Sequence, residues 1–314
     1  MIQAEDSCAS GVAVFGDNTM PNTQTILTII FCLVDDLVNR HARTKPGVRA
    51  KFSDSELIAL VLYKELAGIE SEHQLLRLIR RDYQDLFPKL IGQSQFNRRA
   101  RSLCWLIEKI RQDVLDKLNA SWPEFVIIDS TPVPMKHAVR AARTKSEKSE
   151  LIGFGRRFVH KEDYYGMKLH LLVNRYGVPT TATVTRPSVA DCVVVSQMLE
   201  NRANLTVLGD KAYSGKPLRE QLLREQSILL IAPAKAYPGH RNTASERYAL
   251  RKGRLLIESV INMLKNHLQL SRILARTELG LLARIQRKLT AFVAAIYINL
   301  ELGRPCLAIK SLVA

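Results

Sequence analysis

The sequence predicts a mixed α/β fold, in which a five-stranded mixed sheet is flanked by helices and preceded by an all-α N-terminal region. Two observations carry this prediction. Up to about residue 120, apolar residues recur at three- and four-residue steps, the period of amphipathic helices. Beyond it, short apolar or alternating runs typical of strands are separated by helical segments. The 314 residues suffice for both parts, and 46% apolar with 24% charged residues excludes a disordered chain.

The N-terminal region is expected to contain four helices. Their approximate ranges are 23–40, 53–68, 71–82 and 94–118. Ser53 begins the second helix with a capping box, because its side chain can accept a bond from the Glu56 amide while Glu56 returns one. Gly68 ends this helix.

Arg98 and Arg99 lie in the first turns of the fourth helix. Short helices with a basic start to the last one resemble a helix-turn-helix arrangement, so one interpretation is that residues 23–120 bind DNA. Surface arginines occur on any small helical bundle, so a structural or dimerisation bundle is the alternative.

The second part of the chain alternates strands and helices after an antiparallel meander of three strands. The strands are expected at 125–128, 165–174, 180–185, 205–208 and 228–232. The helices are expected at about 190–200, 215–225, 244–268 and 276–302. This order predicts a mixed sheet with helices on its faces.

The charge is strongly basic, which makes nucleic acid the first partner to test. The formal net charge is +16 and the isoelectric point is about 9.8. Residues 121–314 hold 30 basic and 15 acidic groups, so nearly all of the excess lies in this part.

Two segments concentrate this charge. Residues 131–168 carry nine basic and four acidic groups, and residues 241–276 carry eight and two. The first contains an insertion, about 131–164, that we expect to be a mobile arm along DNA phosphates. Solubilising surface charge is the alternative. The expected DNA contacts in the second part of the chain are Lys136, Arg140, Arg143, Arg156, Arg157, Lys168, Lys211, Arg251, Arg254 and Lys265.

Other classes of protein find no support in the sequence. The five cysteines are widely spaced and form no Cys-x-x-Cys pair, which argues against a zinc ribbon and a disulfide framework. Neither a signal peptide nor a membrane-spanning segment is recognisable, so a cytoplasmic protein is expected.

Three acidic residues are the candidates for chemistry. Asp129 and Asp210 follow the predicted first and fourth strands, and side chains beyond strand ends often form the sites of open sheets. Glu258 lies on a predicted helix that places Arg251, Arg254 and Lys265 on the same face. Taken singly, each aspartate could instead cap a turn, and the helix face could be a solvated charge stripe.

Together these residues resemble the Asp-Asp-Glu triad of bacterial insertion-sequence transposases. The strings around the two aspartates and on the second strand, 128–133, 209–213 and 165–170, support the resemblance. The last motif reads Arg251-(2)-Arg254-(3)-Glu258-(6)-Lys265 and is similar to the family signature Tyr-(2)-Arg-(3)-Glu-(6)-Lys. Arg251 replaces the signature tyrosine, and Tyr248 lies one turn earlier. The string 31–36 and the compact layout also resemble the insertion-sequence nine-eighty-two family, and the resemblance covers about residues 23–302.

The resemblance implies an RNase H-like catalytic domain that uses two Mg²⁺ or Mn²⁺ ions. Carboxylate oxygens suit these hard cations. Asp129 would bridge both ions, while Asp210 and Glu258 would each complete one site. The resemblance further implies that water cuts the 3′ end of the element and that the 3′-OH then attacks target DNA. Terminal inverted repeats, target DNA and a second copy of the chain are the implied partners, at the bacterial nucleoid.

The expected domains are a flexible arm (1–22), a helical DNA-binding region (23–120), a catalytic domain (121–305) and a tail (306–314). Two alternatives to a transposase are an RNase H-like nuclease that cuts without joining and a catalytically dead DNA-binding protein. Asp191, near the site, is expected to cap a helix. His170, on an alternating strand, is expected to be structural.

Overall fold

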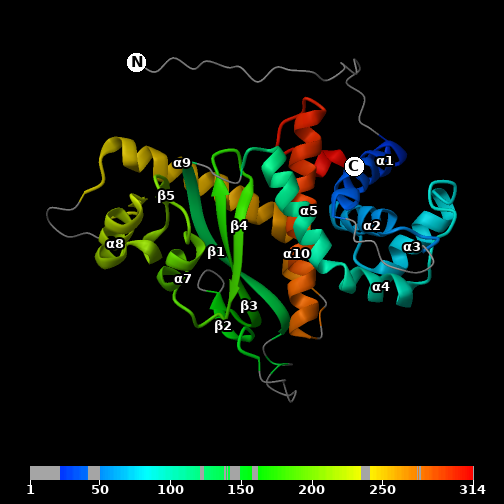
Figure 1. Cartoon of the computed structure of the whole chain (residues 1–314). Coiled ribbons are helices and arrows are strands. Elements are labelled where there is room, and N and C mark those ends of the chain that lie inside the picture. Colours follow the sequence, from blue (N-terminus) through cyan, green and yellow to red (C-terminus); the bar gives the residue numbers. More distant parts are fainter. Residues whose placement is uncertain are drawn as a thin grey trace.

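The computed structural model places a sheet and its helices beside a group of N-terminal helices, with helix α10 (Glu278–Glu301) between them (Figure 1). The structure describes residues 22–41, 50–120, 124–137, 139, 141, 149–157, 162–234, 241–273, 275 and 277–313. The predicted arm at 1–22 therefore lies almost entirely outside the described residues.

The N-terminal region is helical, as the apolar periodicity predicts. Its helices are α1 (Thr23–Arg40), α2 (Asp54–Leu66), α3 (Glu72–Asp82), α4 (Gln93–Ser102) and α5 (Cys104–Lys117). The capping box of α2 is confirmed: the Ser53 amide donates to Glu56 Oε2 at 2.6 Å and the Glu56 amide to Ser53 Oγ at 3.0 Å. Gly68 follows α2 with a left-handed φ of +62°.

The prediction of one helix over 94–118 is wrong, because α4 and α5 are separated at Leu103. This residue has a ψ of 8°, outside the helical range, and its side chain is buried. The apolar periodicity continues through the break, so the sequence gives no signal for it. The bend sets α4 and α5 in different directions and shortens the helix that carries Arg98.

The sheet has the mixed topology that the strand order predicts. Its strands are β1 (Phe125–His137), β2 (Gly153–Arg157), β3 (Glu162–Asn174), β4 (Pro179–Thr185), β5 (Thr206–Leu208) and β6 (Leu229–Ile231). The strands pair in the order β2-β3-β1-β5-β6, and β4 also pairs with β3. Strands β1, β3 and β4 form the antiparallel meander, whereas β5 and β6 run parallel to β1. This confirms the predicted RNase H-like arrangement.

Strand β1 is much longer than expected. Asp129 does not close it, because β3 pairs with β1 from Val126 to His137. On its other side, β5 pairs with β1 only as far as Ile127, which leaves a free edge beyond that point. Pro132 and Pro134 lack an amide hydrogen and are tolerated in β1 because this edge needs no donor.

The sheet also contains a sixth strand, β2, which the sequence does not reveal. It pairs with the first residues of β3, within the segment expected to be a mobile arm. Part of the basic insertion is therefore sheet, and residues 142–148 and 158–161 of it lie outside the described residues.

Helices cover both faces of the sheet. Helices α7 (Asp191–Met198) and α8 (Lys216–Gln226) pack on one face, in a cluster that includes Val126, Leu172 and Val207. The other face packs against α9 (Ala244–Asn262) and α10, together with the N-terminal helices. Helix α9 continues into a π-helical turn, Met263–His267.

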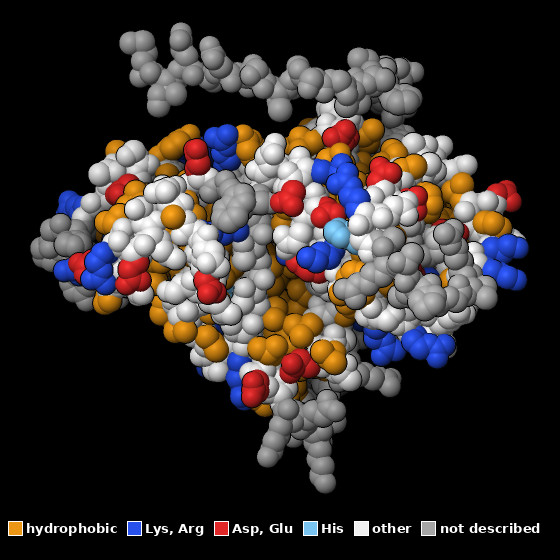
Figure 2. Space-filling view, in the orientation of Figure 1, with side chains coloured by type: hydrophobic (Ala, Val, Ile, Leu, Met, Phe, Trp, Pro, Cys, Tyr) orange, Lys and Arg blue, Asp and Glu red, His pale blue; other side chains and the backbone are white. Residues whose placement is uncertain are grey.

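One hydrophobic cluster joins the N-terminal helices to the sheet. Buried residues of α1, α2, α5, α10 and the inner face of the sheet all belong to it. Between the sheet and these helices, apolar side chains line a surface hollow of about 900 Å³, bordered by Leu169, Val184 and Leu282 (Figure 2). The domain boundary at residue 120 thus stays a prediction. None of the helices described here is long and apolar enough to cross a membrane.

Strand β3 lies close against the backbone of β1 at Gly166. A Cβ atom there would lie 2.1 Å from the Val133 carbonyl oxygen and 2.9 Å from the Met135 amide nitrogen. Gly166→Ala should therefore force the strands apart and lower the free energy of unfolding by about 1–3 kcal/mol, measured by urea denaturation. Gly92→Ser is the control, because a Cβ at this helix start meets nothing within 4 Å. An equal loss in both variants would contradict the expectation.

Candidate active site

Asp129 and Asp210 are brought together by the parallel pairing of β1 with β5. The register aligns Ile127 of β1 with Leu208, the last residue of β5. Each aspartate lies two residues further along its chain. The two carboxylates therefore emerge beside each other, where β5 ends and β1 continues, paired with β3 only.

Glu258 reaches the same place because α9 lies directly on these two strands at Gly253. A Cβ atom on Gly253 would lie 2.9 Å from Leu208 Cδ1 and 3.3 Å from Ile127 Cγ1. Glu258 follows Gly253 by about one and a half turns, or about 7.5 Å along the helix. The absence of a side chain at Gly253 thus sets the distance between the helix and the strands that carry the aspartates.

The sequence analysis missed Gly253, although a signal was present. A glycine inside a helix costs about 1 kcal/mol relative to alanine, so such a position needs a packing reason. Here the reason is the close contact with two buried side chains.

The electrostatics place Asp129 among other carboxylates. Burial, together with the smaller effects of the charges of Asp210, Asp191 and Glu258, raises its pKa to about 6. The Ser130 amide, which donates to Asp129 Oδ1 at 2.7 Å, offsets only part of this effect. The carboxyl group of Asp129 is thus crowded by negative charge, a condition that a bound cation would relieve.

Asp210 and Glu258 are the solvent-facing members of the group. Asp210 is exposed and accepts a hydrogen bond from the Ala212 amide at 2.8 Å, which caps the short turn Lys211–Tyr213. Glu258 is half exposed and accepts a hydrogen bond from Arg254 Nε at 2.7 Å. Among the described residues, no three His, Cys, Asp or Glu side chains are close enough to share a metal ion.

Asp191 does not cap a helix, which corrects the sequence-based expectation. The cap residue of α7 is Ala190, with no side-chain bond, and the Asp191 carboxylate instead accepts from Lys168 Nζ at 3.0 Å. Lys168 also donates to the Val189 carbonyl at 2.7 Å and is only 17% exposed. Lys168, expected to contact DNA, is therefore engaged with the start of α7.

His170 has the structural role expected of it. Its side chain is fully buried, and Nε2 lies 2.9 Å from Thr185 Oγ1. Burial lowers the pKa of His170 to about 4, so the ring is neutral at pH 7, although Nδ1 lies 3.8 Å from Asp191 Oδ1.

The ring of Tyr213 packs against Gly209, the residue before Asp210. It is fully buried, and its ring leaves no room for a Cβ on Gly209, which would lie 2.8 Å from Tyr213 Cδ2. Burial and the nearby Asp191, Asp129 and Asp210 raise the pKa of Tyr213, so the phenol stays protonated. The sequence analysis missed this role, because burial beneath the site leaves no local signal.

The predicted DNA contacts divide into three groups. Arg98, Arg156, Lys211, Arg251 and Arg254 are exposed. Two others are occupied or enclosed: Arg99 donates to Asp54 Oδ1 at 2.5 Å and to the Phe52 carbonyl at 2.8 Å, and Lys265 is half-buried in the π-helical turn. The side chains of Lys136 and Arg157, and Arg140 and Arg143 altogether, lie outside the described residues. The Asp54 ion pair argues against Arg99 as a DNA contact.

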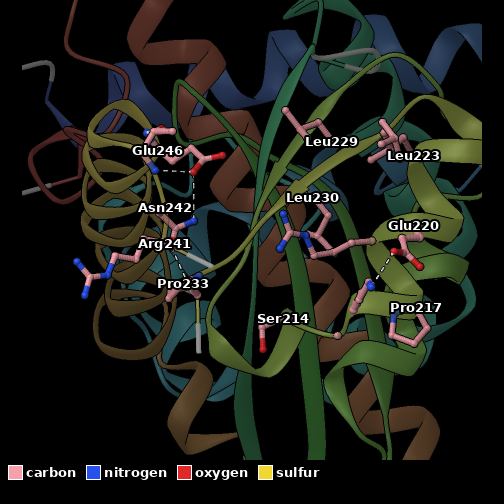
Figure 3. Close-up of a pocket in the computed structure, with 16 residues that line it drawn as sticks. Ser214, Pro217, Glu220, Leu223, Leu229, Leu230, Pro233, Arg241, Asn242 and Glu246 are labelled. Carbon is pink, nitrogen blue, oxygen red and sulfur yellow. Dashed lines mark hydrogen bonds and ion pairs between the residues drawn. The ribbon is translucent and has the colours of Figure 1, made fainter. Parts of the chain in front are cut away.

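A groove of about 920 Å³ lies between α8 and α9, over the edge strand β6 (Figure 3). One end is formed by Ser214 and Gly215, which follow the turn that Asp210 caps. Leu223 and Leu229 give it apolar walls, and Arg219 and Arg241 supply positive charge. The groove is therefore bounded by α8, which follows Asp210, and by the start of α9, the helix that carries Glu258.

The sheet order and the acidic group at the β1–β5 edge define the class: an RNase H-like α/β domain of the transposase type. The Transposase DDE domain family matches residues 119–278, just over half of the sequence, and the chain belongs to this family. Membership of the insertion-sequence nine-eighty-two family stays a prediction.

A solved structure shares this fold. The cryo-EM structure of a piggyBac transposase synaptic complex with hairpin DNA is similar to the chain with a TM-score of 0.50, over 94% of this chain and 79% of that one. The two sequences are 9% identical, so the likeness is one of fold. Among curated proteins, no sequence matches the chain.

The contact at Gly253 can be tested without an activity assay. Gly253→Ala should displace α9 while its better helix propensity offsets about 1 kcal/mol of the strain. The affinity for Mn²⁺, measured by electron paramagnetic resonance, is expected to fall about tenfold, with a change in unfolding free energy below about 1 kcal/mol. Leu255→Ala, at an exposed position of the same helix, is the control. Unchanged Mn²⁺ binding in Gly253→Ala would contradict this role.

The raised pKa of Asp129 predicts a pH-dependent stability. The folded, metal-free protein binds this proton more tightly than the unfolded chain, whose value is near 3.8, so stability falls as the pH rises through about 6. Asp129→Asn should therefore raise the free energy of unfolding in EDTA at pH 8 by up to about 3 kcal/mol. The gain should vanish at pH 4. The exposed Asp85, changed to Asn, should show no such gain, and a gain at pH 4 in Asp129→Asn would contradict the stated cause.

Proposed function

We propose that the protein is a bacterial insertion-sequence transposase that cuts the 3′ ends of its element and joins them to target DNA. The proposal is supported by the Transposase DDE domain together with the parallel register that brings Asp129 and Asp210 to one sheet edge, where the charge of Glu258 also acts on Asp129. Phosphodiester chemistry places negative charge on oxygen, and carboxylates can hold the cations that stabilise it.

The donor set fits two Mg²⁺ or Mn²⁺ ions, since all three groups supply oxygen and Asp129 is crowded by negative charge. When bound, such ions activate the attacking oxygen and stabilise the leaving oxygen. Asp129 would be the group that bridges two ions, because the charges of both Asp210 and Glu258 act on it. Glu258 would first leave Arg254, which its flexible, half-exposed side chain permits.

Arg254 would then be able to bind a DNA phosphate. Released from Glu258, its guanidinium carries a free fork of donors on the exposed face of α9, suited to a DNA phosphate. Arg251 lies on the same helix, with its guanidinium 5.8 Å from the ring of the exposed Tyr248. The groove between α8 and α9 continues this surface with Arg219 and Arg241. A DNA strand leaving the carboxylates would thus meet positive charge from both helices.

Two further parts of the proposal concern partners and place. The element's terminal inverted repeats would bind the helical region and the α9 surface, and two copies of the chain would hold two ends. The protein would act in the cytoplasm at the nucleoid. The rival functions, a nuclease that cuts without joining and a dead DNA-binding protein, differ in the products they leave.

The test is an end-labelled DNA duplex carrying the inverted repeats that flank the gene, incubated with Mg²⁺ and plasmid target. The wild type should yield 3′-end nicks and joined products. Asp210→Ala should lower both by at least about 100-fold, because one cation site is lost. Asp85→Ala, at an exposed position of the helical region, should retain activity.

Two other results would favour one of the rival functions. Nicks without joined products would favour the nuclease. Tight DNA binding without cleavage in Mg²⁺ or Mn²⁺ would favour the binding protein.

A further inference from the structure

A buried lysine joins three elements that are distant in sequence. Lys288, on α10, is 7% exposed. Its Nζ donates to Glu65 Oε2 of α2 at 2.5 Å and to the Leu268 carbonyl at 2.5 Å. Leu268 ends the π-helical turn that continues α9. One side chain thus links the N-terminal helices, α10 and the helix that carries Glu258.

A second bond lies beside the first. Gln269 Nε2 donates to the Gly68 carbonyl at 2.6 Å. Both residues have a left-handed backbone, with φ of +56° at Gln269 and +62° at Gly68, so the chain turns sharply at both places. The end of α2 and the end of α9 are therefore fastened by two adjacent residues, Leu268 and Gln269. We call Glu65, Gly68, Leu268, Gln269 and Lys288 the joint.

Stability alone does not explain the charges of the joint. Burial raises the pKa of Glu65, but Lys288 and Lys64 outweigh it and hold the pKa below its usual value. Lys64 and Arg287 are also buried, so cations outnumber carboxylates around Glu65, and Arg287 Nε and Nη2 have no hydrogen-bond partner among the residues that the structure describes. A well-packed apolar pair is often as stable as a buried ion pair. What an apolar pair cannot do is bind the Leu268 carbonyl.

We propose that Lys288 is a positioning residue, which holds the C-terminal end of the catalytic helix in a fixed orientation to the N-terminal helices through the Leu268 carbonyl. The proposal rests on the proposed function. Lys265 lies three residues before Leu268, in the π-helical turn, and Glu258 lies ten before it. Fixing Leu268 therefore keeps DNA bound to α1–α5 in register with the carboxylates.

The test compares two variants of the joint. Glu65→Leu with Lys288→Met removes the charges together and the bond to Leu268, whereas Glu65→Gln leaves Lys288 able to donate to both acceptors. In the first, amides of 262–268 should exchange hydrogen at least tenfold faster, and the cleavage rate at saturating DNA should fall at least tenfold. The DNA dissociation constant should change less than twofold. Glu65→Gln should stay within about threefold of the wild type in all three.

A control shows whether another ion pair at this interface, one that is only partly buried, has the same effect. Arg111 and Glu108 pair within α5 at 2.5 Å, and Glu108 also accepts from Gln286 of α10 at 3.2 Å. Glu108→Leu with Arg111→Met should leave exchange at 262–268 and the cleavage rate unchanged. An equal effect in this control, or equal loss in both joint variants, would overturn the proposal.

The test also covers two further cases: an apolar variant that does not fold, and a wild type that cuts no DNA. If the apolar pair does not fold, Glu65→Gln with Lys288→Met replaces it, because this pair also removes the bond to Leu268 and leaves no unpaired charge at position 65. Here too exchange at 262–268 should rise while DNA affinity holds, and unchanged exchange would refute the proposal. Faster exchange in a protein whose wild type cuts no DNA would refute the proposed function but leave the joint in place.

Discussion

The rest of the site depends on the contact between helix α9 and strands β1 and β5 at Gly253. The strands alone bring Asp129 and Asp210 to one edge, but the third carboxylate comes from a helix that crosses them. A helix with a side chain at this position would lie further away, since a Cβ atom would meet Leu208 at 2.9 Å. Because Gly253 has no side chain, α9 can lie close to the strands that carry the two aspartates, although glycine has a low helix propensity.

Carboxylates that lie near one another repel, and burial and ion pairing reduce this repulsion differently at each residue. Asp129 is buried enough to keep its proton up to about pH 6, while Asp210 and Glu258 face solvent, where water screens their charge. Arg254 neutralises Glu258, and Lys168 neutralises Asp191. In the structure, the basic residues Arg254 and Lys168 are therefore paired with the acidic group itself.

The N-terminal helices and the sheet share one core, with α10 packed between them. In such an arrangement the surface of α1–α5 has a defined orientation to the carboxylates, because the two parts cannot move independently without opening buried surface. Lys288 adds a directional bond to this packing at the end of α9.

The sequence by itself determined the helical N-terminal region, the capping box at Ser53 and the RNase H-like order of the five predicted strands, since periodicity and capping act within a few residues. It also named Asp129, Asp210 and Glu258 as a group. Only the tertiary structure decided that β1 runs past Asp129, that β2 joins the sheet and that Asp191 binds Lys168. These features depend on partners that are distant in sequence, and such contacts cannot be predicted from the pattern of neighbouring residues along the chain.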